Sequence, residues 1–150
     1  MNQTIEWALF DLNAGRALDF LFHLGIAYVL AFALGWERES NDNTAGLRTF
    51  PLVAMASCAY TMAGVAFLSS TGAEARVIQA IIAGMGFIGG GAILKNNDKA
   101  EVSGTATAAS LWITGAIGMT VALNMLEIAI ILSVITFLTL QTSRILQRDS

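Results

Sequence analysis

The 150-residue sequence is poor in charged residues, in cysteine and in proline. Only 13% of its residues are charged, whereas soluble domains carry about 25%. Because 55% of the residues are hydrophobic, a soluble fold of this size would leave much apolar surface facing water. The small net charge of −3 provides no basic field, which argues against nucleic acid as a partner. The simplest interpretation is that lipid is the solvent for much of the chain.

Cys58 is the only cysteine, so the chain can build neither an internal disulfide nor a thiolate metal site. We expect it to be a small, buried, apolar residue. The sequence contains no signal that calls for a cofactor.

Five apolar windows of 18 to 20 residues follow one another along the chain. Each matches the roughly 20 helical residues needed to cross a 30 Å hydrocarbon core. The sequence therefore predicts an all-α membrane protein with a single domain, residues 1–150, and five spans: 17–36, 51–69, 77–94, 105–123 and 125–143. Asn124 is the only polar residue between the last two windows, which should form a tight helical hairpin.

The basic residues lie mainly on one side of such a five-span topology. The 36–50 loop, the 95–104 loop and the tail hold six of them, and the other side holds Arg16 and Arg76. Because cytoplasmic loops carry an excess of Lys and Arg, we expect the amino terminus outside and the carboxyl terminus in the cytoplasm.

The third window contains the pattern G-x-G-x-x-G within "GMGFIGGGAIL", residues 84–94. A dinucleotide-binding fold would need a longer helix after these glycines and a second βα unit, and neither follows here. The favoured interpretation is a helix face of small residues that allows a neighbouring backbone to approach closely. A kinked segment lining a polar site is the alternative. The glycines concerned are Gly84, Gly86, Gly89, Gly90 and Gly91.

The fourth window offers a partner surface. Ser103, Thr107, Ser110 and Thr114 form a hydroxyl stripe at helical spacing, with Thr105 and Trp112 on the same segment. Such hydroxyls usually bond back to carbonyl groups of their own helix. They could instead line a polar pathway beside the glycines of the third window.

A charged cluster lies between the first two windows, in "GWERESNDNTAGLRTFPLV", residues 35–53. Its candidate ligand-binding or clamp residues are Glu37, Arg38, Glu39, Arg48 and Thr49. One interpretation is that these are ordinary loop-end charges with snorkelling arginines. The other places Arg48 at a helix amino terminus that begins near Pro51, where anions are favoured. Its anion could be Glu37, our first choice, or an external phosphate or lipid head group.

Three further ionisable residues, Asp19, His23 and Glu127, lie within apolar windows. Asp19 and His23 are four residues apart and share a helix face, so they could form a hydrogen-bonded pair or a weak cation site. Two carboxylates and one histidine on different helices do not specify a metal, so these residues are weak candidates only.

Four segments together resemble the MgtC/SapB family of membrane proteins: GWERE (35–39), AGLRT (45–49), GMGFIGGGAIL (84–94) and GTATAASLW (104–112). Their order and spacing cover about residues 20–123. The resemblance implies a bacterial inner-membrane protein of about five spans, matching the transmembrane part of MgtC without its soluble carboxyl-terminal domain. It also implies links to magnesium limitation, to virulence and to the ATP synthase.

These observations favour a non-enzymatic inner-membrane protein that acts by binding a membrane partner or a small anion. A homo-oligomer is expected, because so small a bundle buries little surface by itself. The alternative is a small ion or solute transporter whose path follows the third and fourth helices.

Overall fold

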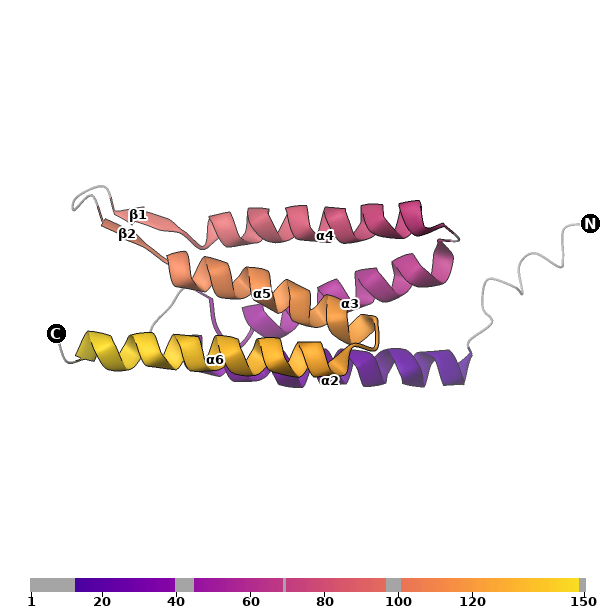
Figure 1. The fold of residues 1–150 in the computed structure, drawn as a ribbon, viewed down its shortest axis with the longest axis horizontal. Coiled ribbons are helices and arrows are strands. Elements are labelled where there is room, and N and C mark those ends of the chain that lie inside the picture. The colour runs from indigo at the N-terminus through magenta and orange to yellow at the C-terminus, as the bar shows by residue number, and fades with distance from the viewer. Residues whose placement is uncertain (1–12, 40–44, 69, 97–100, 149–150) are drawn as a thin grey trace, which may run out of the picture.

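The computed structural model describes residues 13–39, 45–68, 70–96 and 101–148, which form five helices and one small β-hairpin. The helices are α2 (Ala14–Glu39), α3 (Thr49–Phe67), α4 (Thr71–Gly91), α5 (Thr105–Ala122) and α6 (Leu126–Arg148). They run roughly side by side in an elongated bundle (Figure 1). The all-helical fold class expected from the sequence is confirmed.

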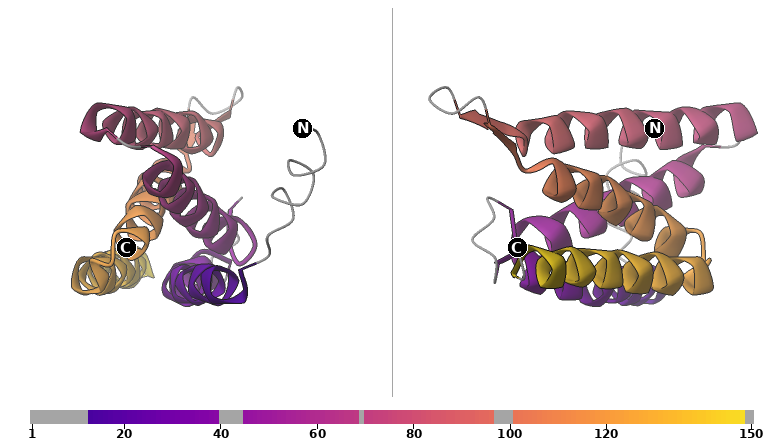
Figure 2. Two further views of the ribbon diagram at one scale, coloured as in Figure 1. Left: turned by 90° about the vertical axis from the view of Figure 1, so that its right-hand side faces the viewer. Right: turned by 60° about the vertical axis from the view of Figure 1, so that its left-hand side comes forward.

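The helices form three layers (Figure 2). At one edge α2 and α6 lie side by side, α3 and α5 cross in the middle, and α4 forms the opposite edge. Figure 1 shows α3 beside α4 at the turn that joins them and well away from α4 at its amino end. The middle layer is therefore packed on both sides, whereas α4 is an outer helix.

Three helices, α2, α3 and α5, are long and apolar enough to cross a membrane. The apolar part of α6 described by the structure, Leu126–Thr142, is shorter. The first two turns of α4 include Glu74 and Arg76. The helices coincide with the five expected windows to within a few residues at most ends, while the number of spans and their orientation stay predictions.

The segment between α4 and α5 departs from the expectation of a plain loop. Its ends pair as antiparallel strands β1 (Leu94–Asn96) and β2 (Glu101–Ser103), with Leu94 opposite Ser103. The third helix consequently ends at Gly91 rather than at Leu94. Three successive glycines weaken the end of the helix, since glycine costs about 1 kcal/mol relative to alanine. Gly104, the N-cap residue before α5, then has a φ of 85°, a conformation that glycine adopts without strain.

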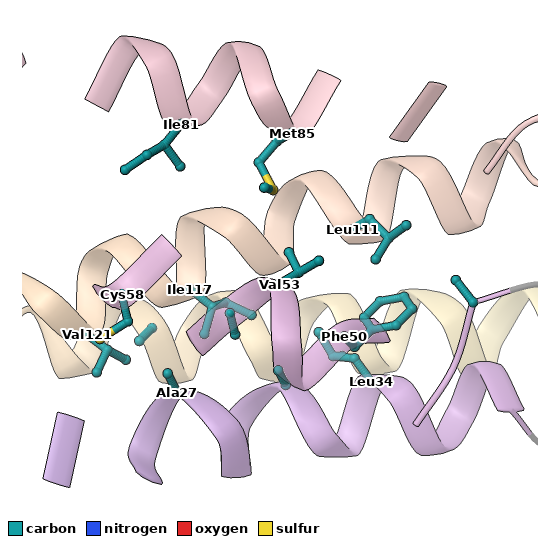
Figure 3. Packing of buried hydrophobic residues seen from close by; sticks show 14 of the residues in the cluster. Ala27, Leu34, Phe50, Val53, Cys58, Ile81, Met85, Leu111, Ile117 and Val121 are labelled. Atoms are coloured by element: carbon teal, nitrogen blue, oxygen red, sulfur yellow. The ribbon is translucent and has the colours of Figure 1, made fainter. Parts of the chain in front are cut away.

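The core lies where α3 and α5 cross between α2 and α4 (Figure 3). Phe50, Leu34 and Ile117 are fully buried there, and Ile81 and Met85 reach in from α4. Cys58 is also fully buried, as expected for a small apolar residue. A Cβ at Gly118 would collide with the Ala54 carbonyl oxygen, so glycine is what allows α5 to approach α3 this closely.

A tight turn joins α5 to α6, as the sequence predicted. Asn124 adopts a φ of 58°, a left-handed conformation that asparagine tolerates better than most residues. Its side-chain oxygen lies 3.1 Å from Nε2 of His23, which connects the turn to α2. Ser133 donates a 2.9 Å hydrogen bond to the Leu30 carbonyl and joins α6 to α2 further along.

Candidate functional site

The segment before α3 packs tightly on the end of α2. A Cβ at Gly35 would come within 3.0 Å of the Gly46 carbonyl oxygen, and a Cβ at Gly46 would collide with the Glu39 side chain. The Glu39 carboxylate accepts a 3.1 Å hydrogen bond from the backbone N–H of Leu47. The two glycines therefore allow the end of α2 and the segment before α3 to approach closely, and the Glu39 carboxylate connects them. This contact gives a structural reason for GWERE and AGLRT to occur together.

The buried ion pair of this region joins neighbours on α2. Nε of Arg38 lies 2.7 Å from a carboxylate oxygen of Glu37, and both residues are more than nine-tenths buried. The Glu37–Arg48 pair expected from the sequence is wrong, because the two side chains form no ion pair although the structure describes both. Arg38 lies next to Glu37 on the same helix and pairs with its carboxylate, whereas Arg48 is exposed at the start of α3.

Arg48 is exposed and occupies the N-cap position of α3, with Thr49 as the first helical residue. Pro51 follows within the first turn, as predicted, where its missing N–H costs no hydrogen bond. Arg48 forms no ion pair with any residue in the described ranges. A guanidinium at the amino end of a helix can bind a phosphate or carboxylate with two parallel hydrogen bonds.

An apolar groove of about 970 Å³ separates α3 from α4, and Arg48 lies at one end of it. Leu52 and Ser57 line the α3 side, and Gly84 and Ile88 line the α4 side. At the other end the two helices meet, since a Cβ at Gly64 would be 3.0 Å from a methyl carbon of Val77. The groove is thus a wedge that is open toward Arg48 and closes toward Gly64.

Ser57 lies on the floor of this groove and is 1% exposed. Its hydroxyl oxygen is buried and has no hydrogen-bond partner among the described residues. An unsatisfied buried hydroxyl costs about 1–3 kcal/mol. Sequence analysis missed both the groove and Ser57, because a serine within an apolar window gives no signal that distinguishes it from one bonded to its own helix.

The structure divides the glycines of the third window. A Cβ at Gly89 would lie 3.2 Å from the Ala108 carbonyl oxygen on α5, which is the close packing that the sequence predicted. At the other four positions an added Cβ would meet no atom within 4 Å: Gly84, Gly86, Gly90 and Gly91. Among the described residues, Gly89 is therefore the one of these five glycines that packs closely on a neighbouring helix. The closer contacts belong to Gly115 and Gly118 on α5.

Two hydroxyls of the stripe, those of Ser110 and Thr114, bond within their own helix. Ser110 donates to the Thr107 carbonyl at 2.9 Å, and Thr114 donates to the Ser110 carbonyl at 2.8 Å. Thr107, Ser110 and Thr114 are all buried, whereas Ser103 falls in β2. Thr105 and Trp112 are exposed on α5. Self-satisfied, buried hydroxyls are typical of packing and not of a polar pathway.

Of the three weak cation-site candidates, Asp19 and His23 lie together, as expected from their spacing, whereas Glu127 forms no metal-ligand cluster with them among the described residues. Nδ1 of His23 donates to the Asp19 backbone carbonyl at 2.8 Å, and Nε2 faces Asn124. The exposed carboxylate of Asp19 lies 3.5 Å from Nδ1, and Glu127 is also exposed. Within the described ranges, no three side chains of His, Cys, Asp or Glu cluster as metal ligands. The nitrogens of His23 thus fix the position of a turn.

Comparison with known proteins identifies relatives. SrpB of Synechococcus elongatus is 34% identical over 148 residues, which covers 91% of this chain and 81% of that protein. "Putative magnesium transporter YhiD" of Escherichia coli K12 is 37% identical over 130 residues, or 82% of this chain. MgtC of Brucella abortus is 36% identical over 93 residues, or 62% of this chain. No solved structure matches.

The chain covers a different share of the length of each relative. The chain covers 60% of YhiD and 38% of the Brucella MgtC. The sequence model of the MgtC family matches residues 24–149, which include all five helices apart from the first turns of α2. This match and the three long apolar helices lead to one conclusion: the chain is a membrane protein that belongs to the MgtC family.

Proposed function

We propose that this protein is a non-enzymatic component of the bacterial inner membrane that binds a membrane partner or an anionic group at Arg48. The observation that carries the proposal is a contrast between two arginines. Arg38 is buried against Glu37, whereas Arg48 is exposed at the open end of the α3–α4 groove and has no ion pair with any residue that the structure describes. A cation that the fold leaves accessible at a helix amino terminus is available to a ligand.

The proposed setting is growth under magnesium limitation or stress. The description of YhiD as a magnesium transporter and the membership of the MgtC family support a role connected with magnesium. The ATP synthase, suggested by the resemblance, is one membrane partner to be tested, and a homo-oligomer is part of the proposal.

Growth in magnesium-poor medium tests this function. We expect cells lacking the gene to be rescued by the wild-type protein and by Arg76→Ala, an exposed arginine on α4, but not by Arg48→Ala at equal membrane abundance. Rescue by Arg48→Ala equal to that by wild type would rule the proposal out.

Transport is the second candidate, favoured by the description of YhiD. The expected path along α4 and α5 finds little support, because Gly89 packs on Ala108 and the α5 hydroxyls bond within their helix. Purified protein in liposomes should be assayed for flux of Mg²⁺, K⁺, Na⁺, H⁺ and phosphate. Selective flux that is lost in Arg48→Ala would establish transport instead of regulation by binding.

A further inference from the structure

We propose that the α3–α4 groove binds an anionic phospholipid of the surrounding bilayer, with its phosphate at Arg48 and an acyl chain between the two helices. The inference rests on the proposed function in that both place the ligand at Arg48. It goes further by naming the ligand and by including the groove, which the sequence did not predict.

The lining of the groove suits a hydrocarbon chain. Apart from Arg48, Thr49, Ser57 and Tyr60 its side chains are apolar, and Leu52 and Phe87 at its border are 60% and 87% exposed. In a bilayer such a surface is in contact with lipid and does not stay empty. Gly84 widens the groove, because the absence of a side chain there leaves open space.

The part of the groove between Arg48 and Ser57 matches the depth of one leaflet. Ser57 follows Arg48 by nine residues, which is about 13 Å along a helix axis. Half of a 30 Å hydrocarbon core is about 15 Å. A lipid whose phosphate is held at Arg48 would therefore extend its chain to the level of Ser57, close to the middle of the membrane.

Charge specifies the head group. The Arg48 guanidinium has no ion pair among the described residues, and it stands at the amino end of the 19-residue helix α3. A phosphate can accept hydrogen bonds from the guanidinium and is also favoured by the helix dipole. Basic residues between membrane helices are known to bind anionic head groups in this way.

The shape of the groove favours a lipid over a partner helix. A helix has a roughly constant diameter of about 10 Å. The wedge, by contrast, is open at Arg48 and closes where Gly64 meets Val77. A lipid has its wide head at one end and a thin chain at the other, which fits a tapering groove.

The first experiment measures lipid binding by the full chain. The protein is purified in detergent, stripped of lipid and titrated with phosphatidylglycerol or phosphatidylcholine, and binding is followed by native mass spectrometry. We expect saturable binding of phosphatidylglycerol that is at least about tenfold weaker in Arg48→Gln, since a charge-assisted contact is lost. Arg76→Gln, the matched control, should bind like wild type, and inorganic phosphate should not displace the lipid.

The second pair of variants tests the groove. Gly84→Leu would place a side chain inside it, whereas Gly86→Leu adds the same side chain on the same helix outside the groove lining. An added Cβ meets no neighbour within 4 Å at either position, so both variants should fold. We expect Gly84→Leu to weaken phosphatidylglycerol binding at least about tenfold and Gly86→Leu to leave it unchanged.

Three results would overturn the lipid site. They are equal affinity for the two lipids, wild-type affinity in Arg48→Gln, and displacement of the lipid by a co-purifying protein helix. The growth assay separates this inference from the proposed function. If the Arg48 variant loses lipid binding but supports normal growth, the lipid site is supported and the proposed function is refuted. If the variant keeps lipid binding but fails to support growth, the lipid site alone is refuted.

Discussion

The two sides of α3 differ in how they use glycine. On the α5 side, a Cβ at Gly118 would collide with the Ala54 carbonyl oxygen, and a Cβ at Gly115 would lie 3.5 Å from the Ser57 hydroxyl oxygen. On the α4 side, Gly84 borders an open groove and an added Cβ would meet nothing within 4 Å. The comparison shows that a glycine-rich helix marks a place where close approach is possible, and that the neighbouring helix determines whether it occurs.

The two arginines at this end of the bundle show the same contrast. Arg38 is buried and bonded to Glu37, so it belongs to the structure of the α2 end. Arg48 is exposed at the groove and has no ion pair within the described ranges, so its charge can act on something else. If this contrast is correct, substitutions at packed or paired positions should destabilise the protein, and substitutions at exposed positions should not.

The largest expected effect concerns the two arginines. Arg38→Met would leave the Glu37 carboxylate, which is 2% exposed, without its guanidinium. Because removing one partner of a buried ion pair costs about 3–5 kcal/mol, we expect severe loss of stability or of folded yield. Arg48→Met should change the stability of lipid-free protein by less than about 0.5 kcal/mol. Thermal unfolding in detergent measures both, and equal losses would contradict the contrast.

The second effect concerns two glycines. Gly118→Ala forces a methyl group toward the Ala54 carbonyl and should cost about 1–3 kcal/mol as α5 is pushed away from α3. Gly86→Ala has open space and gains helix propensity, so it should be neutral or stabilising. The same unfolding measurement applies. If Gly86→Ala destabilised the protein as much as Gly118→Ala, the exposed face of α4 would have to be packed in an oligomer.

The smallest effect concerns two buried serines with opposite expected signs. Ser57→Ala removes an unsatisfied hydroxyl and should stabilise the lipid-free protein by about 1 kcal/mol. Ser133→Ala removes the hydrogen bond to Leu30 and should destabilise it by about 1 kcal/mol. A destabilised Ser57→Ala variant would show that this hydroxyl has a partner.

Sequence analysis predicted the features that depend on local patterns. Window length located the helices, Asn124 located the α5–α6 turn, and the four motifs identified the family. It predicted the Asp19–His23 contact within one helix but not the partner of Glu37. The Glu37–Arg48 pair was wrong because sequence proximity to the same loop does not fix the direction of a side chain. The hairpin from Leu94 to Ser103 was missed because each of its strands has only three residues.

Apolar content, low charge and the lengths of the apolar windows already specify a helical membrane protein, because they are properties of the amino-acid sequence. Motifs of fixed order specify the family in the same way. The folded bundle is needed to show which glycines are packed, which arginine is paired and where a groove lies. These depend on how α3 and α5 cross and on how far α4 stands from α3, and such distances arise from all the contacts of the folded bundle together.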